Sequence, residues 1–290
     1  MNRKQHDLTF SDDTRNKITI FEPQQPDEKN VVIAIFPAMG VRASFYESFA
    51  AELASRNIAA VIADHRGHGN SSIRPSRSVS FGYQEMITID YVETIANIRQ
   101  LFPAKKIVLL GHSLGGKIGS LFAGRYPQAI DGLILLTSCS VYQKAWRGWA
   151  RWKLKLAVAI IRWTAEVLGF YPGHRMGFGG LESRGVIRDW SRQSRCGDYI
   201  VDNADFDYEA GLREIKIPVL AISVAGDTLA PKFAVDHLLG KFEKNQQLTQ
   251  IHLAKNDPRN PGYDHFNWAK NPQKMVDVIL DWLNVGNDES

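Results

Sequence analysis

The sequence predicts an α/β protein with a mostly parallel, doubly wound sheet of about eight strands and an inserted helical cap. Two observations predict this fold class. Short runs rich in Val, Ile and Leu alternate along the 290 residues with longer stretches of helical periodicity, and such alternation is typical of a parallel sheet covered by helices on both faces. The alternation breaks once, between Thr137 and Val219, and a break of that length predicts an insertion.

The strands are predicted from their apolar runs. Each buried run holds four to seven residues, as expected for parallel strands inside a sheet, and these runs are Val31–Phe36, Ala59–Asp64, Lys106–Gly111, Gly132–Thr137, Val219–Val224 and Leu248–Ala254. Two earlier pieces, Asp7–Phe10 and Lys17–Phe21, predict an antiparallel hairpin at one edge of the sheet.

The helices are predicted between these strands, at Phe45–Arg56, Gln84–Leu101, Gly115–Tyr126, Pro231–Phe242 and Pro272–Leu283. Residues 1–138 and 205–290 are expected to form the core, and residues 139–204 the inserted cap. The cap segment holds eleven Lys/Arg and five Asp/Glu, a net charge of +6, whereas the whole chain carries +4. This asymmetry fits an element with a surface role of its own, although a basic face in solvent needs no partner.

The composition is that of an ordinary soluble globular protein, with 44% hydrophobic and 23% charged residues. Met1 to Phe10 is polar and lacks the apolar centre of a secretory signal. Apolar runs such as Leu156–Ile161 are far shorter than the roughly 18–20 residues that span a bilayer. We therefore expect a cytoplasmic protein with no transmembrane segment, in which Cys139 and Cys196 stay reduced and unpaired.

One motif carries chemistry. Gly111-His112-Ser113-Leu114-Gly115 follows a Val/Leu strand and opens a helix, and it has the Gly-x-Ser-x-Gly pattern. A serine at the tip of such a tight strand-to-helix turn has a strained backbone, and side chains on either side would collide there, so glycines are needed. The helix that follows directs its amino-terminal amides at the reacting atoms. Ser113 is therefore the predicted nucleophile.

With this motif the chain resembles the α/β-hydrolase superfamily, and the resemblance extends over nearly its whole length. Asp64–Ser71 (DHRGHGNS) is similar to a loop in the branch that contains monoacylglycerol lipases, lysophospholipases and serine-aminopeptidase-like enzymes. Val224–Asp227 (VAGD) resembles the strand end that supplies the acid, and Asp264–Phe266 (DHF) resembles the loop that carries the base. The order Ser, Asp, His is the order of that fold. The chain also resembles a subgroup of predicted hydrolases.

The residues support Asp227 independently of the resemblance. It directly follows a buried strand, at the carboxyl edge where ligand-facing residues of open parallel sheets lie. The alternative is a turn residue, since Gly-Asp-Thr suits a turn and Pro231 can open the next helix. Three rival carboxylates lie in polar sequence at the exit of the cap and are expected to be solvated, namely Asp202, Asp205 and Asp207.

His265 is the predicted base because it lies in a Gly-, Pro- and Asn-rich loop, and loops of that kind present side chains to ligands. The other histidines are expected to be structural. His252 lies in a strand and His237 in a helix, His112 packs beside the nucleophile, and His65 and His68 stabilise their own loop. No His, Cys, Asp and Glu grouping has metal-ligand spacing, so we expect neither a metal nor another cofactor.

The oxyanion hole is expected to use two backbone amides. The N–H of Leu114 follows the nucleophile, and the second donor normally comes from the loop after the strand Val31–Phe36. Relatives often carry His-Gly in this loop, whereas this chain has Pro37-Ala38-Met39-Gly40. Only a backbone amide is required, so Met39 N–H can serve. The departure concerns the shape of the substrate near the oxyanion.

These residues predict a serine hydrolase, most simply a carboxylic-ester hydrolase acting on a small ester or acyl substrate with an apolar acyl part. Amide or peptide hydrolysis, acyl transfer and cofactor-free perhydrolysis on the same residues are the alternatives within enzymes. A ligand receptor that keeps the fold is the alternative from another class. A nucleic-acid partner is not expected, because the excess of basic residues is confined to the cap and no reader motif appears.

The cap has one clear helical pattern, from Lys144 to Val167. Basic residues share one face, and Trp149, Trp152, Leu156, Ile160, Trp163 and Val167 share the other. We expect the Trp face to pack over the mouth of the site, with Trp149 and Trp163 largely buried and the basic face in solvent. The alternative is that the helix touches a membrane surface or anionic lipid. The glycines at 173, 177, 179 and 180 suggest a flexible stretch that could hinge the cap.

Overall fold

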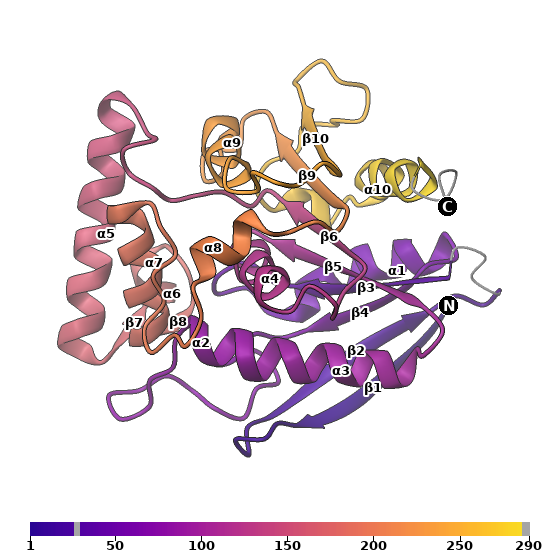
Figure 1. Ribbon diagram of the computed structural model, residues 1–290, viewed down its shortest axis with the longest axis horizontal. Helices are drawn as coiled ribbons and strands as arrows, with labels where there is room; N and C mark the ends of the chain where they lie inside the picture. Colours follow the sequence, from indigo (N-terminus) through magenta and orange to yellow (C-terminus); the bar gives the residue numbers. More distant parts are fainter. Residues whose placement is uncertain (26–29, 286–290) are drawn as a thin grey trace.

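The computed structural model describes residues 1–25 and 30–285 and places eight strands in one sheet, in the order β1-β2-β4-β3-β5-β6-β9-β10 (Figure 1). The six strands from β4 to β10 run parallel, whereas β2 pairs antiparallel with β1 and with β4. Their bounds are β1 Asn2–Thr9, β2 Arg15–Glu22, β3 Val31–Phe36, β4 Ala59–Ala63, β5 Lys106–His112, β6 Gly132–Leu136, β9 Val219–Val224 and β10 Leu248–Leu253. The predicted fold class is confirmed.

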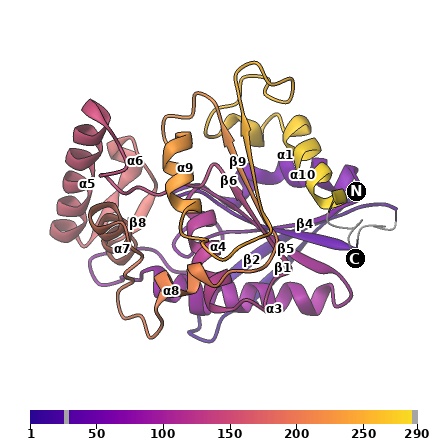
Figure 2. The same ribbon diagram turned by 45° about the horizontal axis from the view of Figure 1, so that its top comes forward.

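Helices cover both faces of the sheet (Figures 1 and 2). One apolar core joins α1 and α10 to one face, and a second joins α3, α4 and α9 to the other. The bounds outside the cap are η1 Ala43–Tyr46, α1 Glu47–Ser55, α2 Tyr83–Glu85, η2 Met86–Tyr91, α3 Val92–Leu101, α4 Leu114–Arg125, α8 Tyr208–Arg213, α9 Lys232–Leu239, η3 Asn267–Ala269 and α10 Gln273–Val285.

The predicted strands agree with the observed ones to within one or two residues, except at the first. β1 begins at Asn2 rather than Asp7, because its outer half is polar and exposed and carries no apolar run that could announce it. The single helix predicted over Gln84–Leu101 is divided by a π-helical turn, η2. A π turn is a short departure from α geometry inside a longer helix, and helical periodicity along the sequence does not locate it.

Between β6 and α8 the chain leaves the sheet and builds a group of elements at one end of it (Figure 1). These are α5 Gly148–Leu168, β7 Phe170–Pro172, α6 Gly173–Met176, β8 Leu181–Ser183 and α7 Arg184–Cys196. We call residues 139–204 the cap segment. Its predicted boundaries, with 1–138 and 205–290 as the core, remain a prediction.

The prediction for the long cap helix α5 is wrong. Trp149 is 80% exposed, Trp152 62% and Trp163 67%, so the Trp face does not pack over the core. A different row of α5 faces inward, where Val158, Ile161 and Ala165 are buried. α5 thus has two apolar rows, and the row of smaller side chains is the one that packs, because short side chains let the helix approach its neighbours closely.

The glycines of the cap segment serve close contacts. A Cβ on Gly180 would lie 2.8 Å from Gly40 Cα and from a ring carbon of His68, and a Cβ on Gly40 would lie 2.0 Å from Gly180 N. The backbone of the cap therefore touches the loop after β3 at these two positions, where only glycine fits. The hinge suggested by the sequence remains a prediction.

Both cysteines are free, as predicted, with Cys139 buried and Cys196 exposed. Across residues 1–25 and 30–285, the helices are all too short or too polar to cross a bilayer.

Candidate active site

Ser113 lies between β5 and α4 with φ 52° and ψ −108°, a conformation that L-residues rarely adopt. Its amide N–H donates to Leu136 O at 3.1 Å, which ties the turn to β6. A Cβ on Gly111 would lie 2.3 Å from Gly116 N, and one on Gly115 would lie 2.4 Å from Phe36 O. The two glycines of the motif are therefore required by close backbone contacts around a strained serine.

His265 and Asp227 meet although 38 residues separate them, with Nδ1 of His265 2.8 Å from Oδ2 of Asp227. The other carboxylate oxygen of Asp227 accepts the N–H groups of Leu229 and Ala230, each at 2.8 Å. Asp227 is thus both a turn residue and the partner of His265. The two roles that the sequence suggested for it are therefore compatible. Both side chains are buried, and the loop bonds hold the carboxylate in place.

The loop that presents His265 is held by its own polar groups. The carboxylate of Asp264 accepts the N–H groups of Phe266 and Asn267, each at 2.7 Å. The indole N–H of the buried Trp268 donates to His265 O at 3.0 Å. These bonds orient the backbone on both sides of the imidazole, and Asp227 orients the ring itself.

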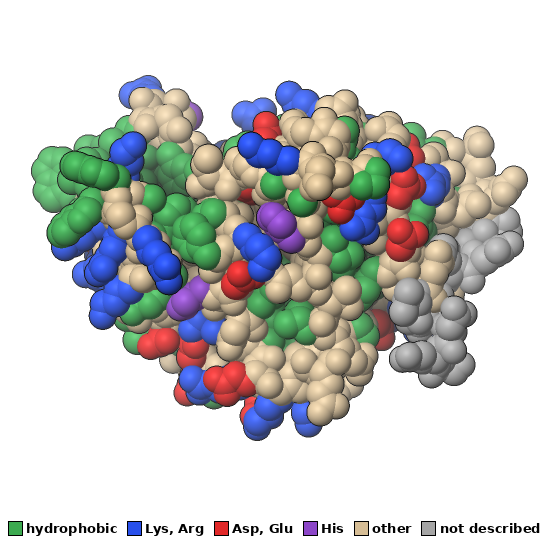
Figure 3. All heavy atoms as spheres, turned by 90° about the horizontal axis from the view of Figure 1, so that it is seen from above, with side chains coloured by type: hydrophobic (Ala, Val, Ile, Leu, Met, Phe, Trp, Pro, Cys, Tyr) green, Lys and Arg blue, Asp and Glu red, His purple; other side chains and the backbone are tan. Residues whose placement is uncertain are grey.

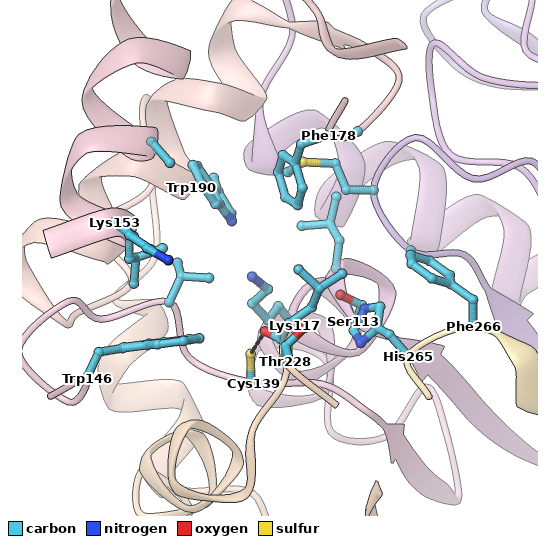
Figure 4. A pocket seen from close by; sticks show the side chains of 18 of the residues that line it. Ser113, Lys117, Cys139, Trp146, Lys153, Phe178, Trp190, Thr228, His265 and Phe266 are labelled. Carbon is cyan, nitrogen blue, oxygen red and sulfur yellow. Dashed lines mark hydrogen bonds between the residues drawn. The ribbon is translucent and has the colours of Figure 1, made fainter. Parts of the chain in front are cut away.

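Ser113 and His265 line one cavity of 510 Å³, within the usual range of about 300–1,000 Å³ for small-molecule sites. Figure 4 shows the two side by side at one end, with Trp146 and Lys153 at the other. Most of the lining is apolar, with Met39, Leu114, Val141, Trp146, Leu154, Phe178, Trp190, Leu229 and Phe266. The cavity lies between the sheet and the cap segment, which supplies Trp146, Leu154, Phe178 and Trp190.

Two lining residues, Met39 and Leu114, offer backbone amides. Leu114 N–H belongs to the first turn of α4, where amides have no acceptor within the helix. The neighbouring Ala38 N–H is already used, because it donates to the Tyr46 hydroxyl at 2.9 Å. Of Ala38 and Met39, therefore, only Met39 has an amide without an acceptor recorded in the described part of the chain.

His112, beside the nucleophile, is a packing residue as predicted. Its ring is fully buried, and Nδ1 lies 2.7 Å from the Tyr46 hydroxyl. Its ring centre lies 4.9 Å from that of His265 and 5.0 Å from that of Trp268. Burial, with the nearby His265, holds the pKa of His112 well below its ordinary value. The ring is therefore neutral, and it packs against the ring of His265.

The two loop histidines differ from each other. His65 is buried, which lowers its pKa to about 3, and its Nε2 lies 3.0 Å from the Tyr91 hydroxyl. His68 does not stabilise its own loop but pairs with Glu182 of β8, with Nε2 3.2 Å from Oε2. Burial acts to lower the pKa of His68, but the Glu182 carboxylate outweighs it and the net shift is upward. The pair links the core to the cap segment.

The remaining candidates lie in structural bonds. His252 Nδ1 is 2.8 Å from Ser223 Oγ, and the ring of His237 packs against Tyr142. Among the rival carboxylates, Asp202 pairs with Arg192, Asp205 pairs with Arg125, and Asp207 caps α8 by accepting Ala210 N–H. All three have partners within the protein and none lines the cavity, so Asp227 is the carboxylate that the structure brings to His265.

Among the residues of the cavity that the sequence interpretation missed, Lys117 is the one with a titratable group nearest in sequence to Ser113. It lies on α4 four residues after Ser113, hence one turn further along the same side of the helix. That spacing was the available signal, and a lysine in an otherwise apolar helix face gave a second. Within residues 1–25 and 30–285, no group of three or more His, Cys, Asp and Glu side chains is arranged to hold a metal ion.

Comparisons with known proteins agree with this architecture. A family model described as serine aminopeptidase, S33 (Hydrolase_4) matches residues 27–194. The Pantoea ananatis protein provisionally named carbamate hydrolase RutD is 24% identical over 90% of each chain. Monoglyceride lipase of Mus musculus is 29% identical over 37% of this chain and 34% of its own length, and lysophospholipase L2 of Escherichia coli K12 is 30% identical over 46% and 39%.

Solved structures share the fold at low sequence identity. Est1E of Butyrivibrio proteoclasticus, solved with ferulic acid bound, superposes with a TM-score of 0.64 at 15% identity, covering 96% of this chain and all of its own. Proline iminopeptidase of Mycobacterium smegmatis gives a TM-score of 0.64 at 14% identity over 97% and 98% of the two chains. These neighbours establish the α/β-hydrolase fold.

Proposed function

The chain belongs to the serine aminopeptidase (S33) family of α/β hydrolases, and on that premise we propose that it is a serine hydrolase that cleaves small carboxylic esters with an apolar acyl part. One observation carries the proposal. The strained Ser113 opens into the same apolar cavity as His265, whose Nδ1 is held by Asp227 at 2.8 Å. A nucleophile, a base and a carboxylate that orients the base are the parts that acyl transfer through serine needs.

In this proposal His265 takes the proton of the Ser113 hydroxyl as Ser113 Oγ attacks the acyl carbonyl carbon. Asp227 keeps the imidazole in the tautomer whose Nε2 accepts that proton, and it stabilises the imidazolium. The amides of Leu114 and Met39 bind the oxyanion, and each such donor contributes about 3 kcal/mol in the transition state. His265 then gives its proton to the departing alcohol, and water hydrolyses the acyl-enzyme by the same steps in reverse.

The lining of the cavity favours an ester over the aminopeptidase reaction in the family's name. An aminopeptidase must bind the positively charged terminal amine of its substrate, which calls for a carboxylate near the serine. The described residues that line the cavity include Lys117 and Lys153 and no Asp or Glu. Asp227, the carboxylate of the proposed mechanism, is already bound to His265. Two relatives, named monoglyceride lipase and lysophospholipase L2, support the same choice.

Two measurements test the proposal. A fluorophosphonate probe should label the protein on Ser113, as located by mass spectrometry, and Ser113→Ala should not be labelled. Ser120→Ala is the matched control, because Ser120 lies on the same helix α4 and bonds to Gly116 O instead of lining the cavity. Turnover of p-nitrophenyl esters of increasing chain length should exceed that of amino-acid p-nitroanilides.

Other outcomes distinguish the alternatives. An adduct on a different serine would overturn the assignment of the nucleophile. Preference for the anilides would favour the amide or peptide hydrolase, and product formation that requires a second alcohol or peroxide would favour the acyltransferase or perhydrolase. A folded protein that binds esters without reacting with either reagent would be a ligand receptor.

A further inference from the structure

Lys117 is a buried lysine whose side chain faces the cavity. Only 4% of the residue is exposed, and Figure 4 shows its amine directed into the open space between Ser113 and Trp146. Within residues 1–25 and 30–285, its Nζ makes no hydrogen bond or ion pair with another protein group. A buried charge without a partner is costly, so such a group is expected to have a function.

The protein groups around Lys117 do not neutralise it. Burial raises the pKa of the neighbouring Cys139 to about 11, so that side chain stays a neutral thiol, and its Sγ donates to Leu229 O at 3.4 Å. No carboxylate occurs among the described residues of the cavity lining. Burial also lowers the pKa of Lys117, as expected where no anion compensates the cost of desolvation.

We propose that Lys117 binds an anionic group of the substrate, so that the preferred esters carry a carboxylate on the part that fills the cavity beyond Ser113. The inference rests on the proposed function for the reaction and adds the class of substrate. One ammonium group is a compact point charge with three donors, which suits one carboxylate. The apolar walls around it suit the chain that joins this carboxylate to the ester.

The test compares two esters that differ only at the far end of the acyl chain. Mono-p-nitrophenyl adipate and p-nitrophenyl hexanoate have the same number of acyl carbons, and only the adipate ester carries a terminal carboxylate. The ratio of their kcat/KM values should favour the adipate ester. In Lys117→Met this ratio should fall about ten- to hundredfold, the effect of losing a hydrogen bond to a charged group.

The control is Lys216→Met, which removes an exposed lysine outside the cavity and should leave the ratio as it is. Lys117→Gln provides a second variant that keeps a polar group, and thermal unfolding checks that each variant is folded. An unchanged ratio in folded Lys117→Met and Lys117→Gln would overturn the proposal.

A binding experiment separates this inference from the proposed reaction. Calorimetric titration of Ser113→Ala with adipate should show binding that the added Lys117→Met change weakens about tenfold or more. If the wild-type protein hydrolyses neither ester but adipate binding depends on Lys117, the proposed reaction is wrong and the anion site stands. If both esters are hydrolysed and Lys117→Met leaves the affinity for adipate unchanged, the proposed reaction stands and the proposed anion site is refuted.

A second inference comes from the outer face of α5. We call Trp149, Trp152, Leu156, Ile160, Trp163 and Val167 the outer row, and each of these residues is between 45% and 80% exposed. Figure 3 shows hydrophobic side chains gathered at the end of the molecule where α5 lies, with Lys and Arg side chains beside them. An apolar patch of this kind on a protein surface indicates an interaction site.

The charges beside the outer row are of one sign. Residues 132–165 contain six Lys/Arg and no Asp or Glu. The ammonium group of Lys155 lies 5.0 Å from the ring centre of Trp152, so the cationic and aromatic side chains are intermixed. The first acid along the helix, Glu166, is already paired with Arg162 and Arg188.

We propose that the outer row docks on an anionic lipid surface. A second copy of this chain, placed against the same face, would bring like charges together, whereas anionic headgroups complement the lysines and arginines. Tryptophan suits the boundary between acyl chains and water. Because Ala150, Lys153 and Leu154 on another face of α5 line the cavity, docking would bring the site next to the lipid.

Co-sedimentation with vesicles tests this inference. Vesicles of phosphatidylcholine and phosphatidylglycerol should bind the protein, vesicles of phosphatidylcholine alone should bind it less, and raised salt should weaken binding by screening. The double variant Arg151→Glu, Lys155→Glu should lower the affinity for these vesicles by about tenfold or more. The double variant Trp152→Ser, Trp163→Ser should abolish sedimentation with them. Lys216→Glu with Lys274→Glu, two exposed lysines elsewhere, is the matched control.

Two results would overturn the lipid proposal. One is equal binding by the wild-type protein and the Arg151→Glu, Lys155→Glu variant. The other is dimer formation in analytical ultracentrifugation that the Trp152→Ser, Trp163→Ser change removes, together with no vesicle binding. The second result would assign the outer row to an interface between copies of the chain.

Discussion

The hydroxyl of Tyr46 lies 2.7 Å from Nδ1 of His112, the residue that precedes Ser113. The same hydroxyl accepts the N–H of Ala38 at 2.9 Å. Tyr46 is fully buried. A single hydroxyl thus joins the loop that contains Met39 to the turn that contains Ser113.

Tyr46→Phe should therefore weaken both the fold and the site. The change leaves two buried groups unpaired, Ala38 N–H and His112 Nδ1, at a cost of about 1–3 kcal/mol each. Chemical denaturation measures the loss, and kcat for a p-nitrophenyl ester should fall because the Met39 amide is no longer held. Tyr263→Phe is the control, since that hydroxyl bonds to Asn271 O away from the cavity. A fully stable and active Tyr46→Phe would contradict this role.

Asp227→Asn should lower turnover by about three to four orders of magnitude while the protein stays folded, because the amide leaves the imidazole of His265 in the wrong tautomer. Steady-state hydrolysis of a p-nitrophenyl ester measures the effect, and His265→Ala should do similar damage. Asp202→Asn and Asp207→Asn should keep near-normal rates, since their partners are Arg192 and Ala210 N–H. The reverse pattern would show that another carboxylate serves the histidine.

Gly115→Ala should destabilise the protein and reduce its activity. The new methyl group would lie 2.4 Å from Phe36 O and 2.6 Å from Pro37 O, both backbone atoms that cannot give way locally. We expect a loss of about 1–3 kcal/mol, typical of overpacking, seen as a lower midpoint in urea. Gly240→Ala, where the nearest atom is 3.5 Å away and φ is −60°, should instead be neutral or stabilising by about 0.4–1 kcal/mol. Equal effects at both positions would refute the steric argument.

Lys117→Met should raise the melting temperature at neutral pH, because it replaces a buried amine that has no protein partner in the described residues with an apolar side chain. The pKa of Lys117 is lowered by burial from 10.5, so between the lowered pKa of the folded state and 10.5 the unfolded chain binds more protons at this residue than the folded one does. The contribution of Lys117 to stability therefore improves as pH rises toward 10.5. The advantage of Lys117→Met should shrink over the same range. Thermal unfolding at several pH values measures it, and a lower melting temperature in the variant at pH 7 would contradict it.

The sequence by itself determined the features that depend on local pattern. The strands from Val31 to Leu253 were found because a strand buried on both faces is a short apolar run. Ser113 was found because a strained turn between a strand and a helix needs glycines at fixed spacing. Asp227 and His265 were found from their places after a strand and in a loop, and the structure brings them to 2.8 Å.

Only the tertiary structure decided which surfaces meet. α5 carries two apolar rows, and nothing within the helix says which of them another part of the chain will cover. The row with Val158, Ile161 and Ala165 packs against the rest of the protein, whereas Trp149 and Trp163 are exposed to solvent. The contacts of His68 with Glu182 and of Tyr46 with His112 join residues 114 and 66 positions apart. Lys117 is buried for the same reason, since the cavity that it lines is completed by Cys139, Trp146 and Leu229 from distant parts of the chain. The local sequence determines the periodicity of a helix or strand and the positions where only glycine fits. Whether a given face is buried depends on which other segment of the chain packs against it.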